Sequence, residues 1–145
     1  MNGMSARAGA VGLVALGGGV GAACREGVCL LIPSVAGAPA AIPVVNVVGA
    51  FLLGYLTASL ARAGTPPPPL ATRLKLLLGT GFCGGFTTYS SLATDAAVLL
   101  DHSRFGAAAV YLLATVLLGA LATIAGILLA GHRHGRHTRT GGAPA

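Results

Sequence analysis

Four long apolar runs constrain this chain more than any other feature. They extend over Ala8–Ile32, Ile42–Ala61, Leu74–Leu100 and Phe105–Ala130, and each reaches the roughly 20 residues that a helix needs to cross the hydrocarbon of a bilayer. Only 8% of the 145 residues are charged and the mean hydropathy is +0.83, whereas soluble domains carry about 25% charged residues. The sequence therefore predicts an all-α membrane protein with four transmembrane helices and short loops.

These runs use nearly the whole chain and leave no room for a soluble domain. We expect one transmembrane domain over residues 1–131 and a basic, disordered cytoplasmic tail over residues 132–145. The tail holds three histidines among arginines, and a segment beside anionic lipid explains this composition better than a metal site does. The first apolar run resembles a signal peptide, but it is long and leads into Arg25-Glu26, so we expect it to be retained as a span.

The basic residues indicate how the chain is oriented. The net charge is +6, but Lys and Arg scattered at helix ends do not form a nucleic-acid-binding face. With four spans both termini share one side, and seven basic residues fall there: Arg7, Arg62, Arg73, Lys75, Arg133, Arg136 and Arg139. The other side has Arg104 and, near the end of the first span, Arg25. The positive-inside rule then predicts an N-in, C-in protein of the plasma membrane.

The stretch Leu78–Leu92 is apolar enough to lie in a membrane but unsuited to a continuous helix. It contains four glycines, each of which disfavours helix by about 1 kcal/mol relative to Ala, and then five consecutive hydroxyl-bearing residues, Thr87–Ser91. Irregular backbone at membrane depth is tolerated only where protein covers it or water lines it. We therefore predict that the third helix is interrupted at an ion or substrate pathway.

Several polar residues in the other spans admit two interpretations. Asn46 is the one amide of the second span, and it either forms an interhelical hydrogen bond or serves function. Thr115 shares a helix face with Tyr111 and Gly119, or bonds only its own backbone carbonyl. Arg25 either snorkels or makes a structural contact, or it attracts anions.

Three further features have structural interpretations. For Asp95, at the far end of the third run, we expect an interfacial or capping role. Gly17 and Gly21 are small enough to let helices approach closely. The three cysteines, Cys24, Cys29 and Cys83, have no metal-ligand spacing, and we interpret them as small packing residues.

Taken together, three motifs resemble those of the CrcB/Fluc fluoride channels. The first is Gly18-Gly-Val-Gly21-Ala22 followed by Arg25, and the second is Val45-Asn46-x-x-Gly49-x-Phe51-x-x-Gly54. The third is Gly84-Gly85-x-Thr87-Thr88 with an aromatic residue and Ser90 after it. The resemblance covers all four spans in order, and the second and third motifs are specific in combination.

This resemblance implies an antiparallel, dual-topology dimer with two narrow fluoride pores and a structural sodium ion at its centre. By motif position, the backbone carbonyls of Gly84 and Thr87 would bind the sodium, together with the same pair from the partner. Gly81 and Gly85 would let the backbone turn at the break.

The resemblance also assigns pore residues. Asn46, Tyr89, Ser90, Ser91 and Thr115 would line the fluoride path, while Arg25 and Asp95 would have structural or vestibule roles. The sequence departs from the family pattern at one position, because Leu92 stands where a second phenylalanine ring is usual. Leu92 has no aromatic edge to face an anion.

We therefore expect passive, channel-type export of fluoride and no enzymatic activity, since no catalytic constellation is present in the sequence. The strong charge bias predicts insertion in one orientation, and hence pairing with a related, oppositely oriented subunit. Two alternatives remain: a non-conducting subunit of such a pair, and a small multidrug exporter. The exporter is disfavoured because Glu26 adjoins Arg25, which would repel a cationic substrate.

Overall fold

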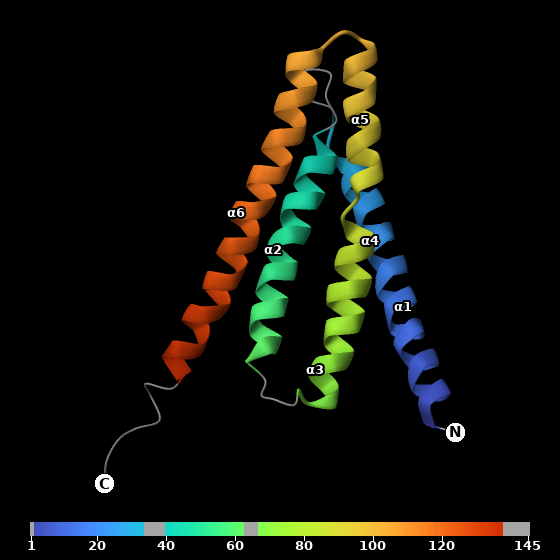
Figure 1. Cartoon of the computed structure of the whole chain (residues 1–145), viewed down its shortest axis with the longest axis vertical. Helices are drawn as coiled ribbons and strands as arrows, with labels where there is room; N and C mark the ends of the chain where they lie inside the picture. Colours follow the sequence, from blue (N-terminus) through green and yellow to red (C-terminus); the bar gives the residue numbers. More distant parts are fainter. Residues whose placement is uncertain (1, 34–39, 63–66, 138–145) are drawn as a thin grey trace.

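The computed structural model of the chain describes residues 2–33, 40–62 and 67–137, and every regular element in these residues is a helix. Figure 1 shows the helices as long rods that converge toward one end of the molecule and diverge toward the other. In chain order they are α1 (Asn2–Leu31), α2 (Ala41–Ala61), α3 (Pro69–Leu74), the π-helix η1 (Lys75–Cys83), α4 (Gly84–Phe86), α5 (Tyr89–Asp101) and α6 (Phe105–His137).

Three helical segments are long and apolar enough to cross a membrane: Met4–Leu31, Ala41–Ala61 and Phe105–His132. They match the first, second and fourth predicted runs. The third predicted run is distributed over α3, η1, α4 and α5, which follow one another along a single line in Figure 1. The chain is therefore an all-helical protein with membrane-spanning character.

Proline positions explain where two of the helices begin. α3 starts at Pro69 after extended Pro68, and α2 carries Pro43 in its first turn. A proline is tolerated in the first turn because the backbone N–H that it lacks would have no intrahelical partner there. The prolines therefore mark helix starts and do not interrupt a span.

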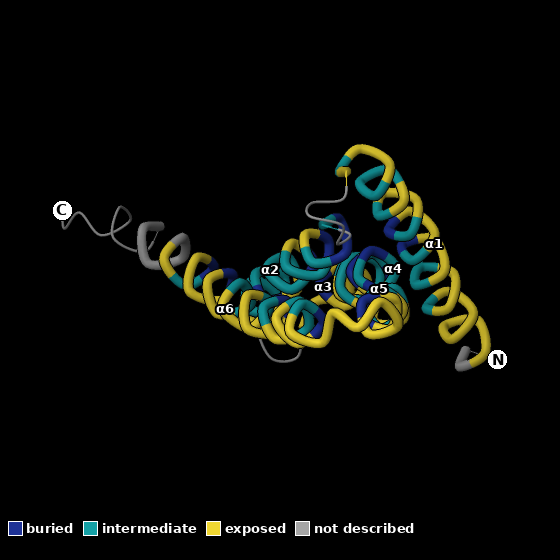
Figure 2. Tube along the Cα trace, turned by 90° about the horizontal axis from the view of Figure 1, so that it is seen from above, coloured by how far each residue is buried: buried dark blue, intermediate teal, exposed yellow. Residues whose placement is uncertain are grey.

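Three pairs of helices make most of the contacts between elements of the chain. α1 packs on η1 and α4, and α2 packs on α6. Figure 2 shows α1 and α6 at the two flanks, with buried residues concentrated where α2 and the α3–α5 line meet between them. Apolar side chains on the outer surface of α6, such as Leu113, Leu117 and Leu121, are exposed, as expected for a helix that faces lipid.

Glycines let α1 approach the backbone of η1 and α4. A Cβ atom at Gly17 would collide with the Leu77 carbonyl, and one at Gly21 would collide with the Phe82 carbonyl. Gly85 lies equally close to the Gly18 carbonyl. The predicted role of Gly17 and Gly21 in close helix approach is confirmed.

The expectation that Gly81 and Gly85 turn the backbone is wrong. Gly81 belongs to η1 and Gly85 to α4, and the helical backbone passes through both. A Cβ at Gly81 would lie 2.9 Å from the Val14 carbonyl oxygen. A larger residue would not fit at either position because α1 crosses there. The irregular backbone begins only after Phe86.

The α2–α6 contact has the same design. Gly54 faces the Thr123 carbonyl and Gly126 faces the Phe51 carbonyl, and neither position has room for a Cβ atom. The Thr123 hydroxyl lies 3.3 Å from the Ala50 carbonyl oxygen and joins the two helices. Of the three cysteines only Cys83 is buried, while Cys24 is exposed, so packing within the chain accounts for Cys83 alone.

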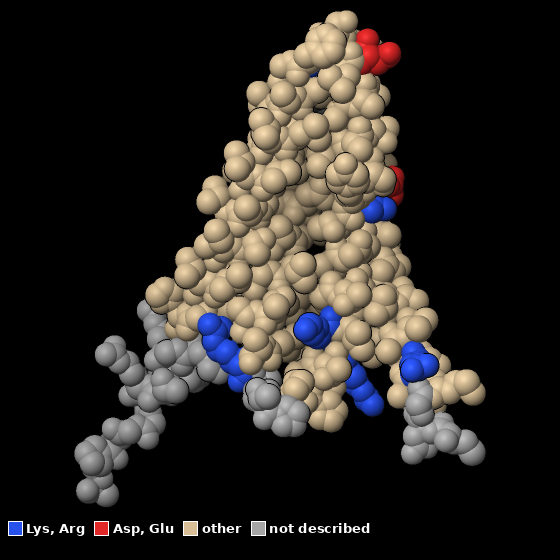
Figure 3. Space-filling view, in the orientation of Figure 1, with Lys and Arg blue, Asp and Glu red and all other residues tan. Residues whose placement is uncertain are grey.

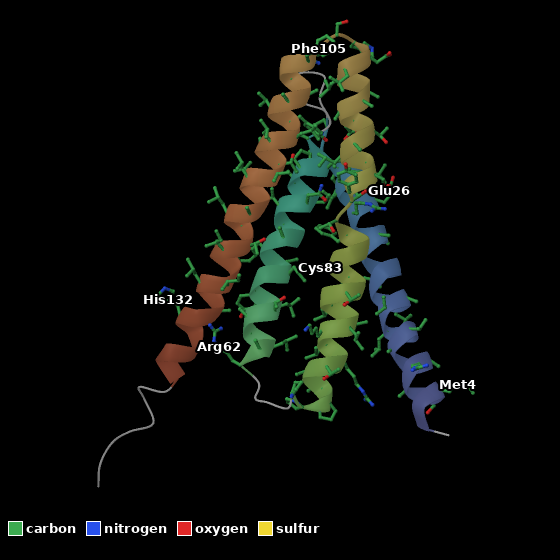
Figure 4. All side chains as sticks on the ribbon, in the orientation of Figure 1. Met4, Glu26, Arg62, Cys83, Phe105 and His132 are labelled. Atoms are coloured by element: carbon green, nitrogen blue, oxygen red, sulfur yellow. The ribbon has the colours of Figure 1, made fainter. Side chains whose placement is uncertain are left out.

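The two ends of the molecule differ in charge. Figure 3 shows the described basic side chains mostly at one end, where α1 begins, α2 ends and α3 lies. Figure 4 places Arg62 and His132 toward that end and Phe105 at the other end. Asp101 ends α5 at the opposite end.

α6 stays helical to His137, past the predicted domain boundary at residue 131, and the last residues of the predicted tail lie outside the described residues.

Candidate functional site

The helical line is interrupted at two threonines. Thr87 (φ −83°, ψ 155°) and Thr88 (φ −149°, ψ 124°) are both extended, between the end of α4 at Phe86 and the start of α5 at Tyr89. Thr88 is the N-cap of α5, and its hydroxyl accepts a hydrogen bond from the Ser91 amide at 3.2 Å. Threonine is a favoured N-cap because its oxygen replaces a missing backbone acceptor.

Asn46 of α2 satisfies the backbone on both sides of Thr88. Its Oδ1 accepts from the Thr88 amide at 2.8 Å, and its Nδ2 donates to the Thr88 carbonyl at 3.0 Å. The side-chain amide thus replaces the acceptor that the Thr88 N–H would have had in a continuous helix. It also gives a second donor to the Thr88 carbonyl, which as the N-cap carbonyl accepts the first hydrogen bond of α5. Unpaired backbone groups are costly in an apolar setting, so this pair of bonds explains how the interruption is stabilised.

The same hydrogen bonds leave two backbone carbonyls without their helical donors. In an unbroken helix the Gly84 carbonyl would accept from the Thr88 amide, which bonds Asn46 instead. The Thr87 carbonyl would accept from the Ser91 amide, which bonds the Thr88 hydroxyl. Gly84 is exposed, and no atom within 4 Å would obstruct a Cβ there. Two oxygen acceptors at one helix break are a chemically suitable donor set for a hard cation such as sodium.

A groove of about 540 Å³ runs along the interrupted helix. Its walls come from α2, η1, the break, the start of α5, and α6. The lining residues are Asn46, Gly49, Ala50, Leu53, Gly79, Thr80, Cys83, Gly84, Thr87, Thr88, Tyr89, Leu92, Thr115, Val116 and Gly119. The groove thus brings together Asn46, Gly84, Thr87, Tyr89 and Thr115, five of the residues singled out from the sequence.

The hydroxyl of Thr115 is already bonded within its own helix. Thr115 is 5% exposed and donates to the Tyr111 carbonyl at 2.7 Å, so the alternative that it bonds its own backbone is confirmed. Because Tyr111 lies one turn earlier in α6, its carbonyl also has a helical donor. The hydrogen bond from the Thr115 hydroxyl is therefore a second bond to this carbonyl. Rotation of the hydroxyl can break it and make the proton available to another acceptor.

Other groups in the groove have donor capacity to spare. The amide of Asn46 has two N–H groups, and the bond to Thr88 uses one of them. Tyr89 is 82% exposed and its ring forms part of the groove wall. Leu92 is buried at 6% exposure and adds only apolar surface to the wall.

Ser90 and Ser91 belong to a hydroxyl cluster beside the groove. The Ser90 and Thr88 hydroxyl oxygens are 3.1 Å apart, and the Thr88 hydroxyl donates to that of Ser91 at 3.2 Å. Because Thr88 has a single proton, this arrangement requires Ser90 to donate to Thr88 and leaves the Ser91 proton available. Neither serine lines the groove itself.

Asp95 and Arg25 lie outside the groove. Asp95 lies in the interior of α5 and accepts a 2.7 Å hydrogen bond from the Tyr111 hydroxyl of α6. Of the expected interfacial or capping roles, capping is therefore wrong. Arg25 is half-buried on α1, and no hydrogen bond or ion pair of its side chain occurs within the described residues. Glu26 next to it lies on the outer side of α1 (Figure 4).

Sequence reasoning missed one central residue, Thr88. It belonged to the run of hydroxyls that marked the interruption, yet neither its capping role nor its pairing with Asn46 was expected. A threonine followed by the first residues of a helix is an N-cap signal, and that signal was available in the sequence. The pairing joins residues 42 positions apart, and no local pattern encodes it.

Comparison with known proteins identifies the family. Residues 12–127 match the family described as CrcB-like protein, Camphor Resistance (CrcB). The chain belongs to this family. This agrees with the resemblance of the three sequence motifs.

Individual relatives carry more specific names. The chain is 43% identical over 117 residues to "Fluoride-specific ion channel FluC 2" of Leifsonia xyli subsp. xyli, covering 81% of this chain and 80% of that protein. It is 44% identical over 119 residues to "Fluoride-specific ion channel FluC" of Deinococcus radiodurans, covering 80% and 90% respectively. A "Fluoride-specific ion channel FluC 1" of Mycobacterium bovis is 41% identical over 107 residues, covering 73% and 78%. These names describe channels, in agreement with the expectation of a non-enzymatic protein.

Proposed function

We propose that this CrcB-family chain is a subunit of a fluoride-specific ion channel that lets fluoride leave the cell passively. The names of its relatives motivate the choice of ion. The main structural support is the groove at the helix break, where Asn46, Tyr89 and Thr115 meet. Conduction requires sites that bind an anion favourably but weakly, and neutral donors meet this requirement better than a buried cation does.

In this proposal the line from α3 to α5 is the third of four membrane spans, interrupted at Thr87 and Thr88. Its two helical parts cover residues 69–86 and 89–101. Asn46 supplies the hydrogen bonds that the hydrocarbon cannot supply. Broken spans of this kind are found where they line a water-filled or ion-filled path.

A structural sodium ion fits the same break. The Gly84 and Thr87 carbonyls would bind it, because both have lost their helical donors to side chains. Two oxygens do not complete the coordination of a hard cation. A second pair from a partner subunit would do so, and the open space beside Gly84 supports such an approach.

The anion path would also need a partner. Tyr89 is mostly exposed although it is a large aromatic residue, and the groove is open along one side of the chain. An antiparallel dimer would cover this side and enclose fluoride between donors of both subunits. Ser91, whose proton is available, would add a donor where the partner approaches.

The partner in this proposal is a related chain of opposite orientation. Arg7, Arg62, Arg73 and Lys75 lie at the beginning of α1, the end of α2 and the region of α3 and η1. Such a bias favours N-in, C-in insertion in the plasma membrane, so one sequence would not supply both orientations. Leu92 offers neither a donor nor an aromatic edge, so the path in this subunit would depend on Asn46, Tyr89 and Thr115; a non-conducting subunit is the alternative.

Fluoride efflux from liposomes tests the proposal. The purified chain is reconstituted alone, and then after co-expression with a related CrcB-family chain of the opposite charge bias. Efflux that requires both chains is the expected result. Efflux from the chain alone would establish a homodimer and contradict the one-way insertion. If neither preparation releases fluoride, while a fluoride-conducting relative does so under the same conditions, the proposed function is wrong.

Exchanging pore residues separates a conducting subunit from a silent one. Thr115→Val in this chain should lower efflux through the assembled pair several-fold. Unchanged efflux would instead identify this chain as the non-conducting member. The multidrug exporter lacks structural support, because exposed Glu26 adjoins Arg25 and lies outside the groove.

A further inference from the structure

A second cleft lies far from the helix break, between α1 and α3. Below the glycine crossing of α1 with η1 and α4 the two helices diverge (Figure 1). The opening has a volume of about 780 Å³. Its lining residues are Ser5, Ala6, Gly9, Ala10, Leu13, Pro67, Pro69, Thr72, Arg73 and Leu76.

The shape of this cleft follows from the sequence. Gly17 and Gly21 hold α1 against the backbone of η1 and α4, and the two helices diverge from that crossing toward the N-terminus. The side chains before the crossing on α1, at Gly9 and Ala10, are too small to fill the gap. A cleft remains because the glycine crossing keeps the helices together at one end only.

The cleft is polar at one end and apolar at the other. Leu13 and Leu76 lie on the side nearest the crossing, while Arg73 and Thr72 lie on α3 at the basic end of the molecule. Among the described residues of the lining, Arg73 is the one charged side chain, and none is acidic. Other basic side chains at the same end raise the local positive potential (Figure 3).

We propose that this cleft binds one anionic phospholipid, with the phosphate at Arg73 and part of an acyl chain between α1 and α3. An apolar gap that opens to hydrocarbon is filled by lipid because water there would lack hydrogen-bond partners. The charge at the mouth selects an anionic headgroup, since a basic residue near an anionic membrane surface contributes about 1 kcal/mol. The cytoplasmic leaflet carries such lipids and is where the basic end belongs in an N-in protein.

Native mass spectrometry of the full chain tests this site. The protein is extracted from bilayers with equal amounts of phosphatidylglycerol and phosphatidylcholine, and the retained lipids are counted. The wild-type chain should retain phosphatidylglycerol preferentially. Arg73→Gln should lower the ratio of the two retained lipids about five-fold. The measurement needs no fluoride transport, so it is independent of the proposed function.

Two further variants separate the site from general surface charge. Arg62→Gln removes the same charge at the same end of the molecule but lies outside the cleft, and it should change the ratio less than two-fold. Ala10→Leu keeps the charge and fills the cleft wall, and it should reduce the retention of both lipids. Equal effects of Arg73→Gln and Arg62→Gln would overturn the proposal in favour of diffuse attraction. An Ala10→Leu variant that retains lipid normally would place the lipid elsewhere and would also overturn the proposal. A spectrum in which Ala10→Leu converts a dimer to a monomer would overturn it as well, because the cleft would then hold a second chain.

Discussion

At the scale of single residues, Asn46 connects stability and function most directly. Its side chain accepts from the backbone N–H of Thr88 and donates to the backbone carbonyl of the same residue, and it lies in the wall of the groove. The sequence left two interpretations of this amide, an interhelical bond or a functional group. The structure supports the interhelical bond, and the second N–H of the amide leaves the functional role open to experiment.

We expect Asn46→Ala to destabilise the protein by about 1–3 kcal/mol, because it leaves the Thr88 amide unpaired and removes the second donor to the Thr88 carbonyl. Thermal unfolding in detergent micelles measures this effect. Asn46→Asp is the matched variant, since its carboxylate can still accept from the Thr88 amide but cannot donate to the carbonyl. It should be destabilised at least as much as Asn46→Ala, because a carboxylate is costly at membrane depth and its second oxygen faces the Thr88 carbonyl. It should also lose fluoride efflux, because a negative charge repels the anion. Equal stability of Asn46→Ala and wild type would contradict the pairing.

Thr115→Val removes a hydroxyl at nearly constant volume. The Tyr111 carbonyl keeps its helical donor, so the free energy of unfolding should change by no more than about 1 kcal/mol. Fluoride efflux should nevertheless fall several-fold, because the hydroxyl that can rotate toward an anion is gone. Thr123→Val is a stringent control: the Thr123 hydroxyl bonds the Gly119 carbonyl of its own helix and the Ala50 carbonyl of α2 but does not line the groove, so its loss removes at least as much helix support as Thr115→Val. Equal loss of efflux in both variants would attribute the effect to the helix and not to the path.

At the scale of helices, the glycines organise packing more than they organise the break. Gly21 of α1 lies against the Phe82 carbonyl, whereas a Cβ atom at Gly19 of the same helix would meet no other atom within 4 Å. The two residues have the same intrinsic effect on helix formation, so they separate packing from propensity.

We therefore expect opposite effects from the same substitution in α1. Gly21→Ala should destabilise the protein by about 2 kcal/mol or more, because α1 must move away from η1 and α4. Gly19→Ala should be neutral or stabilising by up to about 1 kcal/mol, since alanine favours helix. Chemical denaturation in micelles compares the two variants. A Gly21→Ala variant as stable as Gly19→Ala would show that the crossing is looser than the contacts indicate.

The same helices show how far sequence reasoning reached. Hydropathy predicted the helical segments, and the run Thr87–Ser91 predicted an interruption close to its actual position. The glycines gave a misleading reason for it, because the backbone of Gly81 and Gly85 stays helical. Low propensity alone does not open a helix in an apolar environment, where every backbone group needs a partner. The helix is interrupted where Asn46 and Thr88 supply replacement bonds, and the Asn46 pairing depends on three-dimensional contacts that a local pattern does not contain.

At the scale of the whole molecule, the distribution of charge is the basis for proposing a partner of opposite orientation. Arg62 ends α2, Arg73 lies in α3 and Lys75 begins η1, so these three basic residues belong to the same end of the molecule. The groove at the break is open on one side. A chain that inserts in a single orientation needs a partner with the opposite bias to form an antiparallel pair. The orientation in the membrane is therefore the property that decides between a homodimer and a dimer of two related chains.

Reporter fusions at both termini measure that orientation. The wild-type chain should place both termini in the cytoplasm in nearly all copies, because basic residues in short loops near span ends are retained there. The triple variant Arg62→Gln, Arg73→Gln, Lys75→Gln should give a mixture of both orientations, since it removes three of the seven basic residues on that side. The control replaces Arg104, on the opposite side, with Gln and should leave the termini inside. Equal N-in and N-out populations of the wild-type chain would contradict the one-way insertion and with it the need for a different partner. A homodimer would then be the functional unit.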